Sequence, residues 1–183
     1  MRRMEGLKIV ALCVLAAVTY GIAHDQVTAR LCVEYFTIGH PRILDTDSPT
    51  LLGLVWGVVA TWWVGVMLGV PLAIAARVGA AHKVSASALV RPVCILVVVM
   101  SIVAVAAGLT GHSTATHDNG QLASIIAPRV PVDRRVAFMT ALFAHNASYL
   151  SGFVGGVVLI IMVIVRRRHA WRQSMYFAPP SVH

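Results

Sequence analysis

Four long apolar stretches, separated by short polar or charged ones, dominate the pattern of side chains along this chain. Each stretch has the roughly 20 mostly apolar residues that a helix needs to cross the hydrocarbon core of a bilayer. We expect membrane helices at about 7–36, 50–76, 91–110 and 134–165. The pattern therefore predicts an all-α polytopic membrane protein, an up-and-down bundle of four transmembrane helices in a single membrane domain over residues 1–183.

The first apolar stretch continues into a polar segment, residues 24–41, with the sequence HDQVTARLCVEYFTIGHP. Apolar residues still recur at helical spacing up to Tyr35, and Arg30 and Glu34 are spaced for an ion pair one turn apart. We therefore expect one long helix, from about residue 7 to Phe36, whose last turns stand outside the bilayer.

Small residues at Gly21 and Ala23 also permit a different interpretation, in which a signal peptide is cleaved before His24. An N-terminal histidine can chelate copper through its amine and its ring. The helical pattern continues past this position, which favours an uncleaved membrane anchor.

Small residues repeat every four positions in the second and fourth stretches, so they share one face of each helix. Such faces let helix backbones approach closely in lipid, where apolar side chains alone give helices little reason to associate. They predict contacts with partner membrane helices through Gly53, Gly57, Gly65 and Gly69 in the second stretch and Ser148, Gly152 and Gly156 in the fourth.

The composition excludes a soluble domain, because hydrophobic residues make up 58% of the chain and charged residues 12%. The net charge of +8 does not indicate nucleic-acid binding, since the basic residues flank the apolar stretches and do not form a separate basic surface. The expected partner is the lipid bilayer.

The basic residues also predict an orientation. Lys and Arg gather at the N-terminus, around residues 77–91 and after residue 165, whereas all acids but Glu5 fall elsewhere. With the positive ends inside, both termini are cytoplasmic and the loops 37–49 and 111–133 are outside. A bacterial cytoplasmic (inner) membrane is the expected location, with a flexible tail at 174–183.

This topology gathers histidines and carboxylates on the outer side. Imidazole and carboxylate are the ligands of divalent zinc, iron, manganese and copper. We predict a metal site centred on His24, Glu34, His40 and His145, with Glu34 as a ligand or as the catalytic general base. Weaker candidates are Asp25, His112, His117 and Asp118.

Several alternatives remain open. The histidines can be solvated surface residues, Glu34 can simply pair with Arg30, and His145 can hydrogen-bond Tyr149; no H-E-x-x-H motif makes the metal prediction specific. The chain can also be a non-catalytic assembly subunit of a membrane complex, or a haem protein with two outer histidines as axial ligands. Transport is disfavoured, because no charged residue falls in the middle of an expected span.

The segment at 24–41, with TWWVG in the second stretch, RPV at the start of the third and AHNASY in the fourth, resembles a group of uncharacterised bacterial integral membrane proteins. The resemblance covers most of the chain. It implies a bacterial origin and four membrane helices, and it implies no activity, cofactor or site.

Overall fold

The computed structural model describes the backbone of residues 2–176 and the side chains of residues 4–174. This part of the chain is helical and contains no strand. Its elements are α1 Arg2–Leu31, α2 Val33–Thr37, α3 Pro49–Val59, α4 Trp62–Arg77, α5 Ala86–His117, α6 Gln121–Ile126, the 3₁₀ helix η1 Val132–Arg134 and α7 Arg135–Tyr176.

Among the described residues, four helical segments are long and apolar enough to cross a membrane, as the hydropathy pattern predicts. They are Met4–Leu31, Pro49–Arg77, Ala86–His117 and Val132–Ser174. Their apolar side chains face outward in large numbers, with Leu15, Ile102 and Leu150 each more than 60% exposed. An exposed apolar surface of this extent is what a bilayer solvates.

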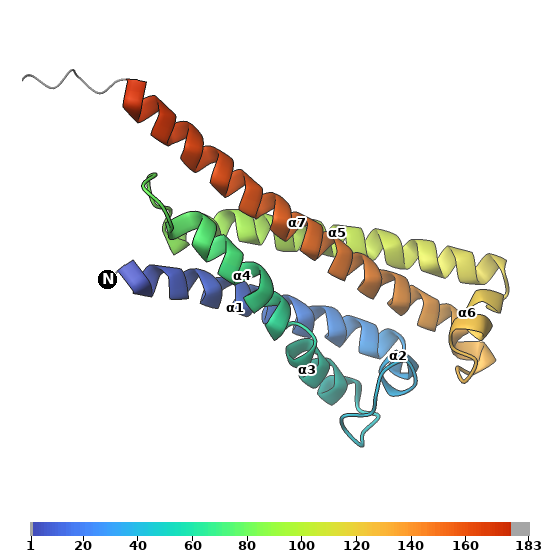
Figure 1. Ribbon diagram of the computed structural model, residues 1–183. Coiled ribbons are helices and arrows are strands. Elements are labelled where there is room, and N and C mark those ends of the chain that lie inside the picture. Colours follow the sequence, from blue (N-terminus) through green and yellow to red (C-terminus); the bar gives the residue numbers. More distant parts are fainter. Residues whose placement is uncertain (1, 177–183) are drawn as a thin grey trace, which may run out of the picture.

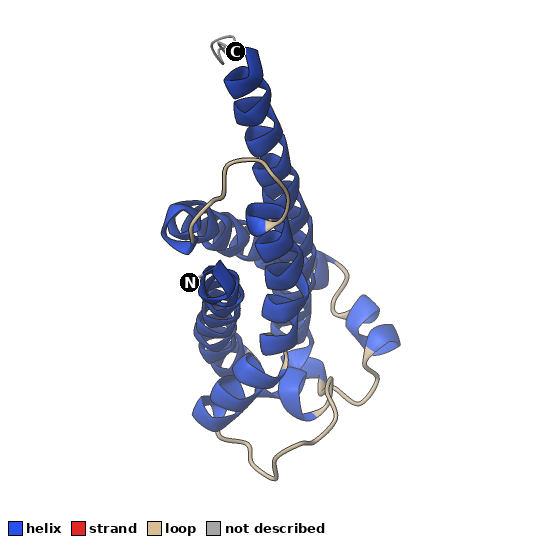
Figure 2. Ribbon diagram, turned by 60° about the vertical axis from the view of Figure 1, so that its left-hand side comes forward, coloured by secondary structure: helices blue, strands red, loops and turns tan. Residues whose placement is uncertain are grey.

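The helices pack as two pairs. α1 lies along α3 and α4, α5 lies along α7, and the pairs meet through contacts of α1 with α5 and of α4 with α7. Figure 1 places the start of α1, the α4–α5 connection and the end of α7 at one end of the molecule, and α2 and α6 at the other. Figure 2, turned by 60°, shows the same long helices with the short ones at the opposite end from the termini.

The small-residue faces are used inside the chain. A side chain on Gly57, Gly65 or Gly69 would meet the backbone or Cβ of α1, and one on Gly152 or Gly156 would meet Met100 of α5 or Leu68 of α4. Close backbone contact at these glycines brings α1 against α3 and α4. Binding of partner helices through these faces stays a prediction.

The first helix begins and ends earlier than its pattern predicts, and the expectation of one helix over 7–36 is wrong. α1 ends at Leu31, Cys32 has an extended backbone (φ −152°, ψ 96°), and α2 then begins at Val33. Arg134 donates a hydrogen bond of 3.2 Å to the Leu31 carbonyl. A residue distant in sequence thus satisfies a carbonyl that the helix end leaves without a partner.

The second span is also interrupted. α3 ends at Val59 and α4 begins at Trp62, where the Thr61 hydroxyl donates to the Gly57 carbonyl. Threonine bonding of this kind weakens the helical ladder and bends helices. Pro71, by contrast, lies within α4 without ending it.

The third and fourth helices exceed the expected ranges of 91–110 and 134–165. α5 begins after Ser85, whose hydroxyl caps it by accepting from the Ala88 amide at 3.4 Å, and it extends to His117. α7 begins at Arg135 after the 3₁₀ turn η1, and it continues past the arginine cluster to Tyr176. The tail predicted at 174–183 therefore begins within α7, and residues 177–183 lie outside the described part of the chain.

Two apolar cores hold the helices together. One, at the end of the molecule that contains α2 and α6, includes Phe36, Met139 and Val130. The other, toward the chain termini, includes Ile9, Leu72 and Leu89. Polar side chains of α1 and α7 meet between these cores, and they form the candidate site.

Candidate functional site

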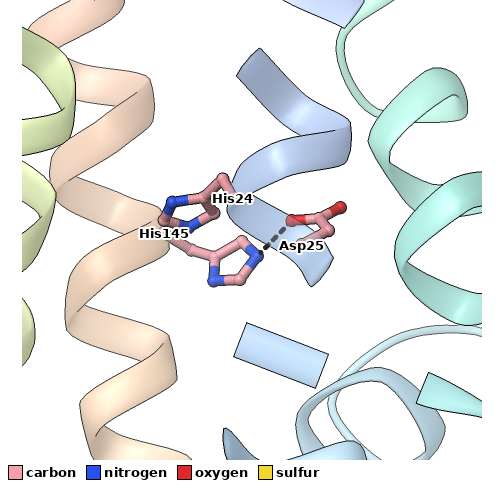
Figure 3. A group of neighbouring side chains, drawn as sticks. All are labelled: His24, Asp25 and His145. Atoms are coloured by element: carbon pink, nitrogen blue, oxygen red, sulfur yellow. Dashed lines mark hydrogen bonds and ion pairs between the residues drawn. The ribbon is translucent and has the colours of Figure 1, made fainter. Parts of the chain in front are cut away.

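His145 of α7 and Asp25 of α1 form a buried pair. The two atoms in contact, His145 Nε2 and Asp25 Oδ1, are 3.0 Å apart, and each residue is 5% exposed. The other ring nitrogen of His145, Nδ1, lies 2.9 Å from the Ala141 carbonyl one turn earlier in α7. Figure 3 shows the His145 ring pointing from α7 toward Asp25, with the His24 ring beside it.

The partners fix most of the protonation state of this pair. The Ala141 carbonyl can only accept a hydrogen bond, so Nδ1 of His145 carries a proton and donates it. The contact between Nε2 and the Asp25 carboxyl group then needs one further proton, held by the ring or by the carboxyl. A metal cation can take the place of this shared proton, because metal ligands bind in their deprotonated forms.

His24 supplies a third donor beside the pair. Its ring meets the His145 ring edge-to-face with centroids 4.5 Å apart, and Tyr20 stacks on it at 5.6 Å. The Nε2 atom of His24 is buried and has no hydrogen-bond partner among the described residues. A buried imidazole nitrogen without a partner is costly, so its position needs a reason.

Together, His24, Asp25 and His145 make a possible metal-binding set. The candidate ligand atoms of the three residues all lie within 4.8 Å of one another. Two ligand atoms of a tetrahedral site, each about 2.1 Å from the metal, are about 3.4 Å apart. The donors would therefore have to move closer by about an ångström or more to share one coordination shell.

Close packing of α1 against α3 holds the first two donors in place. A side chain on Gly53 would lie 3.0 Å from the Asp25 backbone, and one on Gly57 would lie 2.5 Å from the Ile22 Cα atom. Gln26 also donates to the Thr50 carbonyl at 2.9 Å. The part of α1 that carries the site is thus fixed by backbone contact as well as by side chains.

Two hollows adjoin the site. A cavity of about 60 Å³ is lined by all three donors together with Tyr20, Ser148 and Tyr149, and Tyr20 and Ser148 share a hydrogen bond of 2.7 Å. A larger groove of about 380 Å³ lies between α1, α5 and α7, and His24 and Tyr20 line both. The cavity is large enough for a water molecule with polar partners.

Glu34, the predicted catalytic base, lies outside this cluster. Both of its carboxylate oxygens accept from Arg134 Nε at 3.1 Å, and the Cys32 thiol lies 3.4 Å from one of them. The expected pair of Glu34 with Arg30 does not form, because Arg30 donates to Gln26 and to the Thr50 hydroxyl. Glu34 therefore joins the start of α2 to η1, the short helix immediately before α7.

The titration of this region follows from its contacts. Burial raises the pKa of Glu34, but hydrogen bonds from its own backbone, Arg134 and Cys32, with the charge of Arg134, outweigh it and leave the pKa below its usual value. Burial raises the pKa of the Cys32 thiol to about 11. Near neutral pH the carboxylate is ionised and the thiol is protonated.

Replacing Glu34 with glutamine is expected to lower the free energy of unfolding at pH 7 by about 1–2 kcal/mol, since a partly exposed charged hydrogen bond is lost. Because the folded pKa lies below the unfolded one, this stabilisation is complete above the ordinary value of 4.5 and is lost as the pH falls through the folded pKa. Detergent unfolding of the wild type and of Glu34→Gln from pH 7 to pH 3 measures the difference in their free energies of unfolding. Asp45→Asn, at a carboxyl 99% exposed, is the control that should change little; an equal loss in both variants would contradict the role of the Glu34–Arg134 pair.

His40 lies in a neighbouring aromatic cluster. Its Nδ1 is 2.9 Å from the Tyr35 carbonyl, and its ring packs on Trp56 with centroids 4.8 Å apart. The Tyr35 ring contacts both His40 and His145, with centroid distances of 4.8 and 4.3 Å. The predicted ligands His40 and His145 thus belong to one aromatic cluster, but His40 is not in the group of possible metal donors.

The weaker candidates of the third span are apart from the site. His112 and His117 are exposed on the last turns of α5, where a loop was expected. Asp118 accepts from the amides of Gly120 and Leu122, at 2.8 and 3.0 Å, and so stabilises the turn into α6. Tyr149 is not the hydrogen-bond partner of His145, whose two nitrogens are engaged by Ala141 and Asp25.

The sequence contains a signal for Asp25, because this residue is an acid inside a segment that can span a membrane. Such residues usually face the interior of a bundle and have a partner there. Arg134, Tyr20 and Ser148 carried no comparable signal.

Comparison of the chain with protein families, with curated proteins and with solved structures finds no match.

Proposed function

We propose that this chain is a multi-pass protein of the bacterial cytoplasmic membrane that binds a divalent transition metal through His24, Asp25 and His145. The single observation that carries the proposal is the meeting of these donors in a buried place, where His24 Nε2 has no hydrogen-bond partner among the described residues. The ligand set differs from the sequence-based one, because Asp25 takes the place of Glu34 and His40.

The second contact of His145 supports this assignment. Histidines that bind metals commonly donate their other ring N–H to a carbonyl or carboxylate, which fixes the ring and makes it a better ligand. His145 has this arrangement, with Nδ1 donating to Ala141 and Nε2 directed at Asp25.

Two imidazoles and one carboxylate favour a reactive site over a purely structural one. Structural zinc sites usually have four protein ligands, whereas three ligands leave a position open for water or substrate in zinc enzymes and in non-haem iron enzymes. The open position would face the cavity that Tyr20, Ser148 and Tyr149 line. We therefore favour a metal-dependent enzyme. In it, the groove beside His24 gives the substrate access to the site from the side of the helices.

The charge distribution supports an orientation in the membrane. The end of the molecule where α1 begins and α7 ends carries Lys83, Arg91 and the cluster of Arg166–Arg168, with Glu5 as its acid. At the opposite end Asp45, Asp47 and Asp118 are accompanied by Arg42, Arg129, Arg134 and Arg135, so that end has no excess of basic residues over acids when Glu34 and Asp133 are included. The positive-inside rule then gives an up-and-down bundle with both termini in the cytoplasm. The three donors would lie in the outer half of the bilayer.

Metal analysis of the detergent-purified full chain tests the proposal. Inductively coupled plasma mass spectrometry is expected to find about one zinc or iron atom per chain in the wild type. His24→Ala and His145→Ala should each lower the metal content at least about tenfold, because loss of an outer-shell partner alone already lowers metal affinity by about 10–100-fold.

His112→Ala and His117→Ala are the matched controls, because both histidines are exposed on α5. They should retain the wild-type metal content. Far-UV circular dichroism on every variant separates loss of ligand from loss of fold. A wild type without metal after growth in zinc or iron, or folded His24→Ala protein with full metal content, would contradict the proposal, and a Soret band would point to haem instead.

A further inference from the structure

Another hollow is separate from the two beside the candidate metal site and lies along the α5–α7 pair. It is a groove of about 640 Å³ lined by residues of these two helices alone. The helices lie side by side over much of their length, and α7 diverges from α5 toward its C-terminal end (Figure 1).

The walls of this groove are apolar, and one of its ends is basic. Val99, Val158 and Met162 line it and are each at least 40% exposed, and Arg91 and Arg166 line it as well. The ion pairs formed by the described residues involve neither arginine. Two cations without carboxylate partners thus border an apolar channel.

The dimensions suit one leaflet of a bilayer. From Arg91 to Val99 along α5 is roughly 12 Å, and from Gly155 to Arg166 along α7 is roughly 17 Å, at 1.5 Å per residue. Half of the hydrocarbon core of a bilayer measures about 15 Å. The groove therefore has the arginines near headgroup level and its other end near the middle of the membrane.

We propose that this groove binds an anionic phospholipid, with the phosphate between Arg91 and Arg166 and an acyl chain along the apolar walls. Guanidinium groups suit phosphate because they present paired N–H donors as well as charge. Basic pockets between membrane helices on the cytoplasmic side are a known type of site for anionic headgroups. This inference does not depend on the metal site.

Lipid binding to the detergent-purified full chain tests the inference. The protein is titrated with phosphatidylglycerol or with phosphatidylcholine, and binding is followed by native mass spectrometry. The first molecule of phosphatidylglycerol is expected to bind about 25-fold more tightly than the first molecule of phosphatidylcholine, which is about fivefold for each arginine. Arg91→Gln/Arg166→Gln should remove this preference. Arg172→Gln, at an exposed arginine of the same helix outside the groove, should retain it.

A second pair of variants examines the apolar part of the groove. Val158 lines it, whereas Val154 is similarly exposed and does not. Val158→Trp should weaken phosphatidylglycerol binding while Val154→Trp leaves it unchanged. Equal affinity for the two lipids in the wild type, or an equal effect of Arg172→Gln, would overturn the proposal. Displacement of the lipid by equimolar glycerol phosphate would also overturn it, because the acyl chain would then contribute nothing.

Discussion

Replacing Arg167 with methionine is expected to destabilise the protein by at least about 3 kcal/mol, the largest effect we expect from a change outside the candidate metal site. Arg167 is 8% exposed and donates to the carbonyls of Val78, Ala81 and His82 at 2.8–2.9 Å, and also to that of Ala75. Its guanidinium therefore supplies donors to the end of α4 and to the loop that follows.

The physical reason is the position of these carbonyls. The last turn of a helix leaves its carbonyl groups without backbone partners, and the planar guanidinium can reach several of them at once. Methionine has similar bulk but no donor, so the buried Ala75 carbonyl and three partly buried carbonyls would lose their partners together. Lysine keeps the charge with fewer donors, and Arg167→Lys should fall between the two.

Unfolding of the purified protein by sodium dodecyl sulfate, followed by far-UV circular dichroism, measures this loss. Arg168→Met is the matched control, because Arg168 is the next residue of α7 and is exposed. Its effect should stay within about 0.5 kcal/mol. Equal unfolding midpoints for Arg167→Met and Arg168→Met would show that the carbonyl contacts contribute little.

The four membrane segments could be predicted from the sequence because they depend on local composition. An apolar run long enough to cross a bilayer is visible in any window of about 20 residues. The interruptions at Cys32 and Thr61 could not be predicted in this way, since neither has an adjacent proline or glycine. Contacts made by Arg134 and by the Thr61 hydroxyl accompany these breaks.

The candidate site was predictable only in part, for a related reason. His24 and His145 were predicted to share a site because both fall near the outer end of an apolar helix, and the structure brings them together. Glu34 was predicted to join them because it falls on the same side of the membrane. Its partner is Arg134, 100 residues away in sequence, and no pattern in either segment indicates that contact.

Asp25 illustrates a different limit. Consecutive residues of a helix point about 100° apart, so the spacing within the helix gives no reason for His24 and Asp25 to serve one site, and Asp25 is only a weaker candidate in the sequence. Both residues nevertheless belong to one site, because the His145 ring reaches Asp25 with Nε2 and contacts the His24 ring at its side (Figure 3). The packing of α7 against α1, and not the spacing within α1, makes the cluster.

Substitution of Gly57 by alanine is expected to lower the free energy of unfolding by about 2–3 kcal/mol and to reduce metal binding as well. The added Cβ would lie 2.5 Å from the Cα atom and 2.6 Å from the amide nitrogen of Ile22. These are backbone atoms, so no side-chain rotation can relieve the contact and the two helices must separate. His24 and Asp25 are within one turn of Ile22, and separation would move both donors away from His145.

Two other glycines give graded controls for this experiment. A Cβ on Gly108 would meet Ala144 Cβ at an ordinary 3.5 Å, and one on Gly6 would meet nothing within 4 Å. Gly108→Ala and Gly6→Ala should therefore each change stability by less than about 1 kcal/mol and leave the metal content unchanged. If Gly57→Ala were as stable as Gly6→Ala, the close approach of α1 and α3 would not fix the site. If it were less stable but retained full metal content, the position of α1 would matter for the fold and not for the coordination of the metal.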